Sequence, residues 1–317
     1  MKYQILLYYK YVAVSDAEAV RKEQRELCER LNLKGRIIVA TEGINGTLEG
    51  LVSDTEAYIH AMEESGYFKG INYKKSQGTG QAFPKLSVKI RPEVVTTGVS
   101  GLDPTQTTGK YLSADELHVW YEEGKEFYVV DMRNDYEYAS GHFEGFVPSG
   151  LANFHDLKQV LPKIQHLKSK TIVTVCTGGI RCEKASGFLL QNGFSDVYQL
   201  KDGIQTYMEA YPNEHFKGKL YVFDNRLTLG FNVNDSKHEI VGKCDHCSKS
   251  CDSYVNCAYN ECHRHYISCS ECLDKETGYA FCNQECKENY FKITIHHRAQ
   301  RGLHPAELGH KRVIPAL

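Results

Sequence analysis

One short stretch of this 317-residue chain has the residue types and spacing of a reactive thiol site. Cys176 follows the β-branched run 170–175, which is typical of a buried strand, and precedes a helical pattern over 183–191. It is therefore expected at the carboxyl end of a parallel strand, where open α/β sheets bind their ligands. A thiolate held there, or a larger sulfur anion carried on it, would be a nucleophile.

The residues after Cys176 are suited to stabilise an anion. Gly178 and Gly179 let the backbone curl so that several N–H groups converge, and Arg181 adds a positive charge. A buried structural cysteine is the alternative, but two glycines and an arginine so close together favour the reactive thiol. The predicted active-site loop is Cys176, Thr177, Gly178, Gly179, Ile180 and Arg181, followed by Cys182 as a resolving thiol or a packed small residue.

A second set of chemical groups lies near the C-terminus, where nine of the twelve cysteines fall between residues 244 and 286. Two C-x2-C pairs, 244/247 and 269/272, have a spacing close to that of a zinc ribbon. We expect structural zinc there; reduced free thiols are the alternative, and several pairings satisfy the spacing. The candidate ligands are Cys244, Cys247, Cys251, Cys257, Cys262, Cys269, Cys272, Cys282 and Cys286, with His246, His263 and His265 as substitutes.

The composition is that of an ordinary soluble protein, with 41% hydrophobic and 25% charged residues. The net charge is −2, so any contact with nucleic acid must come from local patches. The N-terminal residues lack a signal-peptide pattern, and no run approaches the ~20 apolar residues of a membrane span. We therefore expect a cytoplasmic protein that does not contact membranes.

Residues 1–95 predict a ferredoxin-like α+β domain with the order βαββαβ, in which helices cover one face of the sheet and the other face is open. The Asn45-Gly46 dipeptide is expected to form the turn between the second and third strands. The predicted strands are 3–9, 36–40, 46–48 and 85–90, and the predicted helices are 15–31 and 53–65.

The end of this domain has no acidic residue between Gly66 and Arg91. Basic and aromatic side chains on an open sheet suit single-stranded RNA, through phosphate pairing and base stacking. A solvated basic face above core aromatics explains the pattern equally well. The candidate RNA contacts are Lys74, Lys75, Lys85, Lys89 and Arg91, interleaved with Tyr67, Phe68, Tyr73 and Phe83.

The rest of the chain predicts a linker, a second domain and a cysteine-rich end. Residues 96–110 are rich in Thr and Gly and form the linker. Strands then alternate with helices over residues 111–217, which predicts a doubly wound parallel sheet that begins at the capping box Ser113 to Glu116. The cysteine-rich segment spans residues 218–290, and a basic tail over 291–317 either holds RNA or is solvated.

The second domain resembles a rhodanese domain. The resemblance rests on residues 130–133, 136–137 and 141–145, the Cys176 loop and the turn at 202–203, in that order. It implies that Cys176 carries sulfane sulfur as a persulfide, since the loop has the length found in sulfurtransferases. It also implies a supporting role for Asp131 and Arg133, although Asp131 is as well suited to tying down loops as to touching substrate.

The flanking regions extend this resemblance to the rhodanese-domain tRNA uridine(34) hydroxylase family. Residues 40–46, 176–186, 243–247 and 251–257 carry it, and it runs over nearly the whole chain. It implies that molecular oxygen is a co-substrate in converting the wobble uridine of a tRNA anticodon loop to 5-hydroxyuridine. The sequence contains no dinucleotide fingerprint, flavin motif or recognisable non-haem iron triad, so no flavin or nicotinamide site is expected.

Two other functions compete with this interpretation. The first is a rhodanese-type sulfurtransferase that uses a thiosulfate or persulfide donor. The second is a non-catalytic RNA-binding module. The intact Cys176 loop counts against the module, and the basic and cysteine-rich flanks count against a small-molecule sulfurtransferase, which needs neither.

Overall fold

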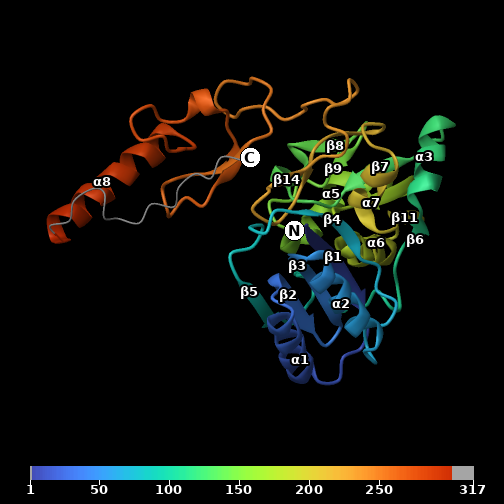
Figure 1. The fold of residues 1–317 in the computed structure, drawn as a ribbon. Helices are drawn as coiled ribbons and strands as arrows, with labels where there is room; N and C mark the ends of the chain where they lie inside the picture. Colours follow the sequence, from blue (N-terminus) through green and yellow to red (C-terminus); the bar gives the residue numbers. More distant parts are fainter. Residues whose placement is uncertain (1, 302–317) are drawn as a thin grey trace.

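The computed structural model describes residues 2–301, with side chains described through residue 292. Figure 1 shows an N-terminal unit (residues 3–90) beside a central unit (residues 110–218), and a C-terminal segment (residues 220–301) that begins against these units and whose later part, including the last helix, extends away from them. No helix in the described range is long and apolar enough to cross a lipid bilayer.

The N-terminal unit is a five-stranded sheet whose strand order is β4-β1-β3-β2-β5. Leu6 and Tyr8 of the first strand pack with Val20 and Tyr58 of the two helices, which form the core on one face. The order β4-β1-β3-β2 with two helices on one side confirms the ferredoxin-like arrangement. The elements are β1 (Tyr3–Tyr11), α1 (Ala17–Arg30), β2 (Lys34–Ala40), β3 (Gly43–Leu51), α2 (Val52–Glu63), β4 (Lys74–Gly78) and β5 (Leu86–Ile90).

Two details of the predicted strands are wrong. Asn45-Gly46 lies inside β3, and the turn comes earlier, because Ala40 already pairs with Gly43. A glycine is needed at 46 for packing, since a Cβ there would lie 2.3 Å from ring atoms of Tyr8. The strand that completes the ferredoxin-like order is β4, antiparallel to β1, and β5 is an additional strand parallel to β2. The sequence of β4 is polar and lies at an edge, so it has no alternating pattern.

The face of this sheet that was expected to be open is covered by the central unit. Tyr9 and Tyr11 alternate along β1 with the core residues and point the other way. The Tyr11 hydroxyl donates to the carbonyl of Ile180 at 3.2 Å, and the Tyr9 hydroxyl donates to Glu183 at 3.0 Å. The N-terminal sheet therefore lies against the segment that follows Cys176.

The central unit is a parallel sheet with the order β6-β11-β10-β7-β9 and helices on both faces. Ile172 packs with Leu189 on one face, and Val173 packs with Leu117 and Ile204 on the other, which confirms the doubly wound arrangement. The elements are β6 (Lys110–Leu112), α3 (Ala114–Glu122), β7 (Tyr128–Asp131), α4 (Asp135–Tyr138), β8 (Gly141–Phe143), β9 (Val147–Pro148), η1 (Phe154–Val160), α5 (Leu161–Ile164), η2 (Gln165–Leu167), β10 (Thr171–Val175), α6 (Ile180–Gln191), β11 (Asp196–Leu200), α7 (Gly203–Ala210) and β12 (Phe216–Gly218).

The C-terminal segment has short hairpins and a small core in which cysteines pack with Tyr221, Tyr254 and Ile267. It contacts the central unit where the Tyr254 hydroxyl donates to the carbonyl of Tyr136 in α4. Most of the predicted basic tail, residues 302–317, lies outside the described residues. The elements are β13 (Leu220–Tyr221), β14 (Thr228–Leu229), β15 (Tyr254–Asn256), β16 (His265–Ile267), η3 (Ser270–Cys272) and α8 (Gln284–Arg301).

Candidate active site

Cys176 lies directly after β10, and the loop that follows leads into α6. Gly179 is the N-cap of α6 with φ of +98°, a left-handed conformation that glycine adopts without strain. Its N–H donates to the sulfur of Cys176 at 3.2 Å, and the nearby backbone N–H groups of Arg181 and Cys182 further favour an anion at this sulfur. The loop residues thus form a cradle of converging donors around one sulfur atom.

This environment favours the ionised form of Cys176. Burial on its own would raise the pKa of the thiol, because a charge in a low-dielectric site is poorly solvated. The hydrogen bond from the Cys182 thiol, the charge of Arg181 and the two backbone donors outweigh burial and lower the pKa to about 6. Burial, together with the neighbouring Cys176, raises the pKa of Cys182 well above its ordinary value. The pair is therefore a thiolate beside a protonated thiol.

Arg181 is held in place by Glu137, which the predicted site residues did not include. Both terminal nitrogens of its guanidinium contact the Glu137 carboxylate, at 2.5 and 2.8 Å, and both side chains are buried. Arg181 also reaches the hydroxyl of Thr177 at 3.4 Å. In the sequence, Glu137 stood out only as part of the rhodanese-like pattern, and nothing in that pattern distinguished it from its neighbours.

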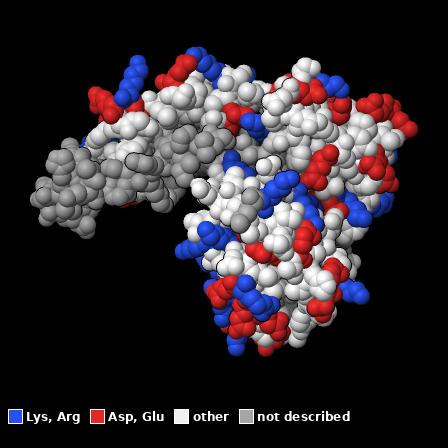
Figure 2. Space-filling model, viewed as in Figure 1, with Lys and Arg blue, Asp and Glu red and all other residues white. Residues whose placement is uncertain are grey.

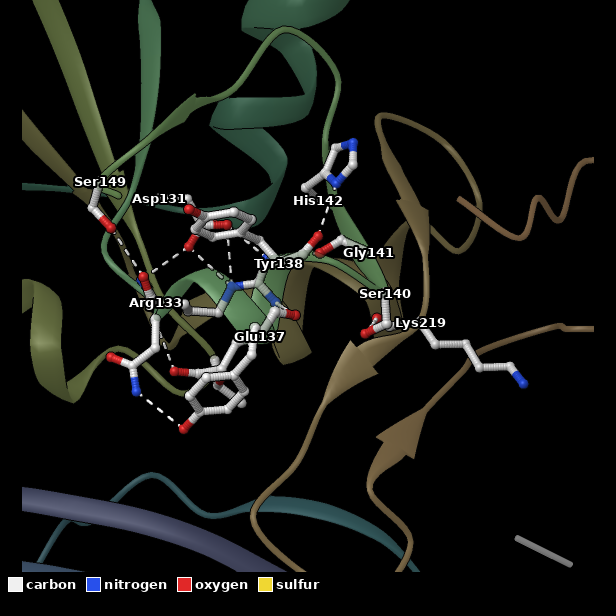
Figure 3. A network of polar contacts seen from close by, with 12 residues as sticks. Asp131, Arg133, Glu137, Tyr138, Ser140, Gly141, His142, Ser149 and Lys219 are labelled. Atoms are coloured by element: carbon white, nitrogen blue, oxygen red, sulfur yellow. Dashed lines mark hydrogen bonds and ion pairs between the residues drawn. The ribbon is translucent and has the colours of Figure 1, made fainter. Parts of the chain in front are cut away.

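Asp131 and Arg133 tie down the loop that carries Glu137 (Figure 3). Their side chains form a fully buried ion pair with a 2.6 Å contact. Arg133 also donates to the carbonyls of Gly141 at 2.7 Å and Glu137 at 3.4 Å. The carboxylate of Asp131 is thereby fully engaged, so the geometry favours loop fixation over contact with substrate.

A second helix fixes the loop from its other side. The N–H of Ile204, in the first turn of α7, donates to the carbonyl of Cys176 at 2.9 Å, and that of Gln205 to the carbonyl of Thr177 at 3.1 Å. Gly203 lies so close that a Cβ there would be 2.6 Å from the nitrogen of Gly179. Only glycine permits this approach of two backbones.

Strand β1 of the N-terminal unit covers the Cys176 loop. A Cβ on Gly178 would lie 2.9 Å from Leu7, and one on Gly179 would lie 2.9 Å from the hydroxyl of Tyr9. As a result, Cys176 has no exposed surface. A cleft of about 530 Å³ opens beside this cover, lined by Tyr9, Tyr111, Glu183, the cations Lys10, Lys74 and Lys201, and neighbouring residues of both units.

Glu183 is a buried carboxylate at the junction of the two units that the sequence did not reveal. It accepts hydrogen bonds from the hydroxyls of Tyr9 and Tyr111 and from Gln199. Thr108, at the end of the predicted linker, contacts it as well. The adjacent Lys184 is also buried and lies 2.8 Å from both Glu42 and Glu93 of the N-terminal part of the chain. These contacts fix the orientation of the cover over the thiol.

The five candidate RNA-binding cations do not form one patch. Those on or beside β4 and those on or beside β5 lie at opposite edges of the sheet. Lys74 is only 5% exposed, and its ammonium pairs with Asp202 of the central unit at 2.9 Å, so its assignment to an open basic surface is wrong. Lys75 is exposed and pairs with Glu56, whereas Lys85, Lys89 and Arg91 are exposed near β5.

The aromatic side chains of the same stretch serve the core. Phe68 and Phe83 are 1% and 2% exposed, and Tyr67 and Tyr73 pack against the core of the N-terminal unit. They therefore offer no stacking platform on an open face. Figure 2 likewise shows acidic and basic side chains interspersed on the visible surface rather than one continuous basic field.

Eight of the candidate metal ligands form two groups that could each hold a metal ion. Cys244, Cys247, Cys269 and Cys272 form one group, and Cys257, Cys262, Cys282 and Cys286 form the other. Within each group all four sulfurs lie within 4.8 Å of one another, and the Cys247–Cys269, Cys262–Cys282 and Cys282–Cys286 sulfur pairs are 3.5 to 3.7 Å apart. Tetrahedral zinc with bonds of about 2.3 Å requires sulfur–sulfur distances of about 3.8 Å, so the residues fit the ion.

The two groups are interleaved along the chain. The C-x2-C pair 244/247 joins the C-x2-C pair 269/272, and the pair 257/262, which lies between them, joins the pair 282/286. Cys251 belongs to neither group; it is buried in the small core with Tyr221 and Tyr254, which corrects its inclusion among the ligands. The two groups need no histidine ligand to reach four donors.

Three family models match consecutive parts of the chain. They are the UPF0176 acylphosphatase like domain over residues 3–94, the Rhodanese-like domain over 113–210 and the Rhodanase C-terminal over 217–287. Curated relatives match nearly the full length. The chain is 44% identical to a tRNA uridine(34) hydroxylase of Enterococcus faecalis and 43% identical to one of Staphylococcus carnosus, each over 91% of both chains. It is 40% identical to one of Cytophaga hutchinsonii, over 90% of both chains.

Proposed function

This chain belongs to the tRNA uridine(34) hydroxylase family, and we propose that it hydroxylates C5 of the wobble uridine of tRNA, with molecular oxygen as co-substrate. The observation that carries the chemistry is the Cys176 cradle, in which several donors and a guanidinium stabilise a thiolate. Cys176 and Arg181 are the proposed catalytic pair. Sulfur transfer is the secondary function that the same loop supports.

Cys176 acts as a nucleophile in this proposal. Its thiolate adds to C6 of the uracil ring, which makes C5 electron-rich and able to react with oxygen. The loop N–H groups and Arg181 stabilise the sulfur when it leaves C6 as an anion. Glu137, Asp131 and Arg133 touch no reacting atom; they are positioning residues that hold Arg181 and its loop.

The base must be splayed out of the anticodon loop to reach the sulfur, and the N-terminal unit must move to admit it. Cys176 is fully buried under Leu7 and Tyr9, so the described structure is the closed form of the site. The cleft beside the cover offers Lys10 and Lys201 to the phosphates that flank the target base. The exposed cations near β5 would extend this contact.

The C-terminal segment is proposed to hold two structural zinc ions, one in each cysteine group. Zinc bound by four thiolates supplies folding energy to a segment with little apolar core. Elemental analysis of protein purified without chelator should give about two zinc per chain. Cys244→Ser and Cys282→Ser should each remove one ion, and Cys251→Ser should remove none. A zinc-free protein with this segment folded would contradict the proposal.

A reconstituted reaction tests the function. Purified protein is incubated with tRNA from cells that lack the gene, in air and under argon, and the nucleosides are analysed by mass spectrometry. The proposal predicts 5-hydroxyuridine in air and none under argon. If the protein transfers sulfur from thiosulfate to cyanide at a rate typical of a sulfurtransferase and does not hydroxylate tRNA, the loop serves the sulfurtransferase function instead.

A further inference from the structure

Hydroxylation by molecular oxygen requires two electrons beyond those of the base. One oxygen atom enters uracil, and the other leaves as water, which takes up two electrons and two protons. The proposed function assigns no source for them. A source is needed close to Cys176, because the second oxygen atom is released where the first one reacts.

Cys182 is an oxidisable group in contact with Cys176 that the proposed reaction leaves unused. It lies in the first turn of α6, where its N–H donates to the carbonyl of Gly179 at 3.0 Å. Its thiol donates to the sulfur of Cys176, and both side chains have no exposed surface. These are the only two cysteines between residues 110 and 218. A thiolate hydrogen-bonded to a protonated thiol is the arrangement from which a disulfide forms on oxidation.

We propose that Cys176 and Cys182 form a dithiol that supplies the two electrons, which makes Cys182 a second catalytic residue of the reaction. The inference rests on the proposed function and names its electron source. The overall reaction takes in uridine, oxygen and two thiols, and it releases 5-hydroxyuridine, water and one disulfide.

The bonds change in four steps. Cys176 sulfur bonds to C6, and C5 takes up oxygen and a proton to give a C5 hydroperoxide. The Cys182 thiol takes the distal oxygen, so the O–O bond breaks and leaves a C5 hydroxyl and a Cys182 sulfenic acid. Loss of the C5 proton then breaks the C6–S bond and frees Cys176. Cys176 finally attacks the sulfenic acid, which forms the disulfide and expels water.

The disulfide must be reduced before the next cycle. A small dithiol or a reduced protein dithiol does this by thiol–disulfide exchange, in which the reductant becomes the disulfide. The enzyme without reductant is therefore limited to one turnover, whereas the enzyme with reductant cycles. This difference separates the dithiol role from a packing role for Cys182.

The test is a single-turnover reaction with fully reduced protein from which the reductant has been removed. Tryptic peptides of the loop are followed by differential alkylation, and tRNA by nucleoside mass spectrometry. The wild type should yield about one 5-hydroxyuridine per active site and an equal amount of Cys176–Cys182 disulfide. Cys182→Ser keeps a hydroxyl donor to Cys176 but cannot be oxidised, so its yield should fall at least about tenfold. Cys182→Ala removes the donor as well and should also slow alkylation of Cys176 at neutral pH.

Two outcomes would overturn the inference. One is a Cys182→Ser protein that makes as much product as the wild type under these conditions. The other is wild-type product formed without loop disulfide. If the wild type makes no product even with reductant present, the proposed function itself fails, which is a separate result.

Discussion

Both terminal nitrogens of the Arg181 guanidinium contact the carboxylate of Glu137, at 2.5 and 2.8 Å, and both side chains are buried. The positive charge of Arg181, which was expected to stabilise an anion at Cys176, is thus shared with a carboxylate from α4. The pairing fixes where the guanidinium lies relative to Cys176. It also links the loop to Arg133 and Asp131, which hold the same segment.

Replacing Glu137 by Gln should destabilise the protein markedly. The change keeps the shape of the side chain but leaves a buried guanidinium without its counter-charge, a loss of roughly 3–5 kcal/mol. The midpoint of thermal unfolding should therefore fall by about 5–10 °C.

Glu126→Gln is the matched control, because Glu126 pairs with Lys170 on the surface. Loss of such an exposed pair should shift the midpoint by no more than about 2 °C. Equal effects of the two substitutions would show that the Arg181–Glu137 pair does not hold the loop.

The rate at which Cys176 reacts with an alkylating reagent should depend on pH as expected for a thiol with a low pKa. Above about pH 6 the thiolate is the main form, and as the pH falls through this value the thiol becomes protonated and unreactive. The rate of alkylation of the loop peptide by a small reagent should therefore rise with pH around a midpoint near 6. A midpoint at the ordinary value of about 8.5 would contradict the proposed anion cradle.

Lys184 should control access to the site. Its buried ammonium bridges Glu42 and Glu93 and so holds the N-terminal part of the chain on α6. Lys184→Ala should loosen this cover, and a bulky thiol reagent should label Cys176 several-fold faster, as measured on the loop peptide by mass spectrometry. Lys75→Ala, which breaks an exposed pair with Glu56, is the control and should leave the labelling rate unchanged. Equal labelling of wild type and Lys184→Ala would refute the role of Lys184.

The exposed cations near β5 should contribute to tRNA binding. Changing Lys85, Lys89 and Arg91 to Glu should weaken binding and reduce the slope of log affinity against log salt by about 2–3. The control is a second triple variant with the same change in net charge. It replaces three lysines of surface ion pairs by Glu: Lys22, Lys170 and Lys237. If both triples weaken binding equally, the edge at β5 has no specific role.

Helices and strands were predicted best from the sequence where neighbouring residues alone determine where the element begins or ends. The capping box of Ser113 and Glu116 forms as expected, and the helix after Cys176 ends at Gln191, followed by the C-cap Asn192 and a left-handed Gly193. The errors arose where a contact with another element decides the structure. Gly46 makes room for the ring of Tyr8 and does not form a turn, and β4 is a polar edge strand held by its pairing with β1.

The same distinction applies to the candidate site. The loop from Cys176 to Arg181 is contiguous, so its glycines and charge could be read from the sequence. Glu137 and Glu183 could not, because their partners lie 44 and up to 174 positions away. The pairing of the cysteines also depends on how β15 and β16 fold back on each other. The limits proposed for the domains, at residues 95, 110, 217 and 290, stay predictions.

Cys176 is the proposed catalytic nucleophile, and its replacement tests the proposed function most directly. Cells that lack the gene should receive wild-type protein, Cys176→Ala or Cys176→Ser at matched levels, and their tRNA nucleosides should be measured by mass spectrometry. We expect the wild type to restore 5-hydroxyuridine and neither variant to do so, although both remain folded with unchanged circular dichroism and zinc content. Restoration of 5-hydroxyuridine by Cys176→Ala would show that Cys176 is not the nucleophile.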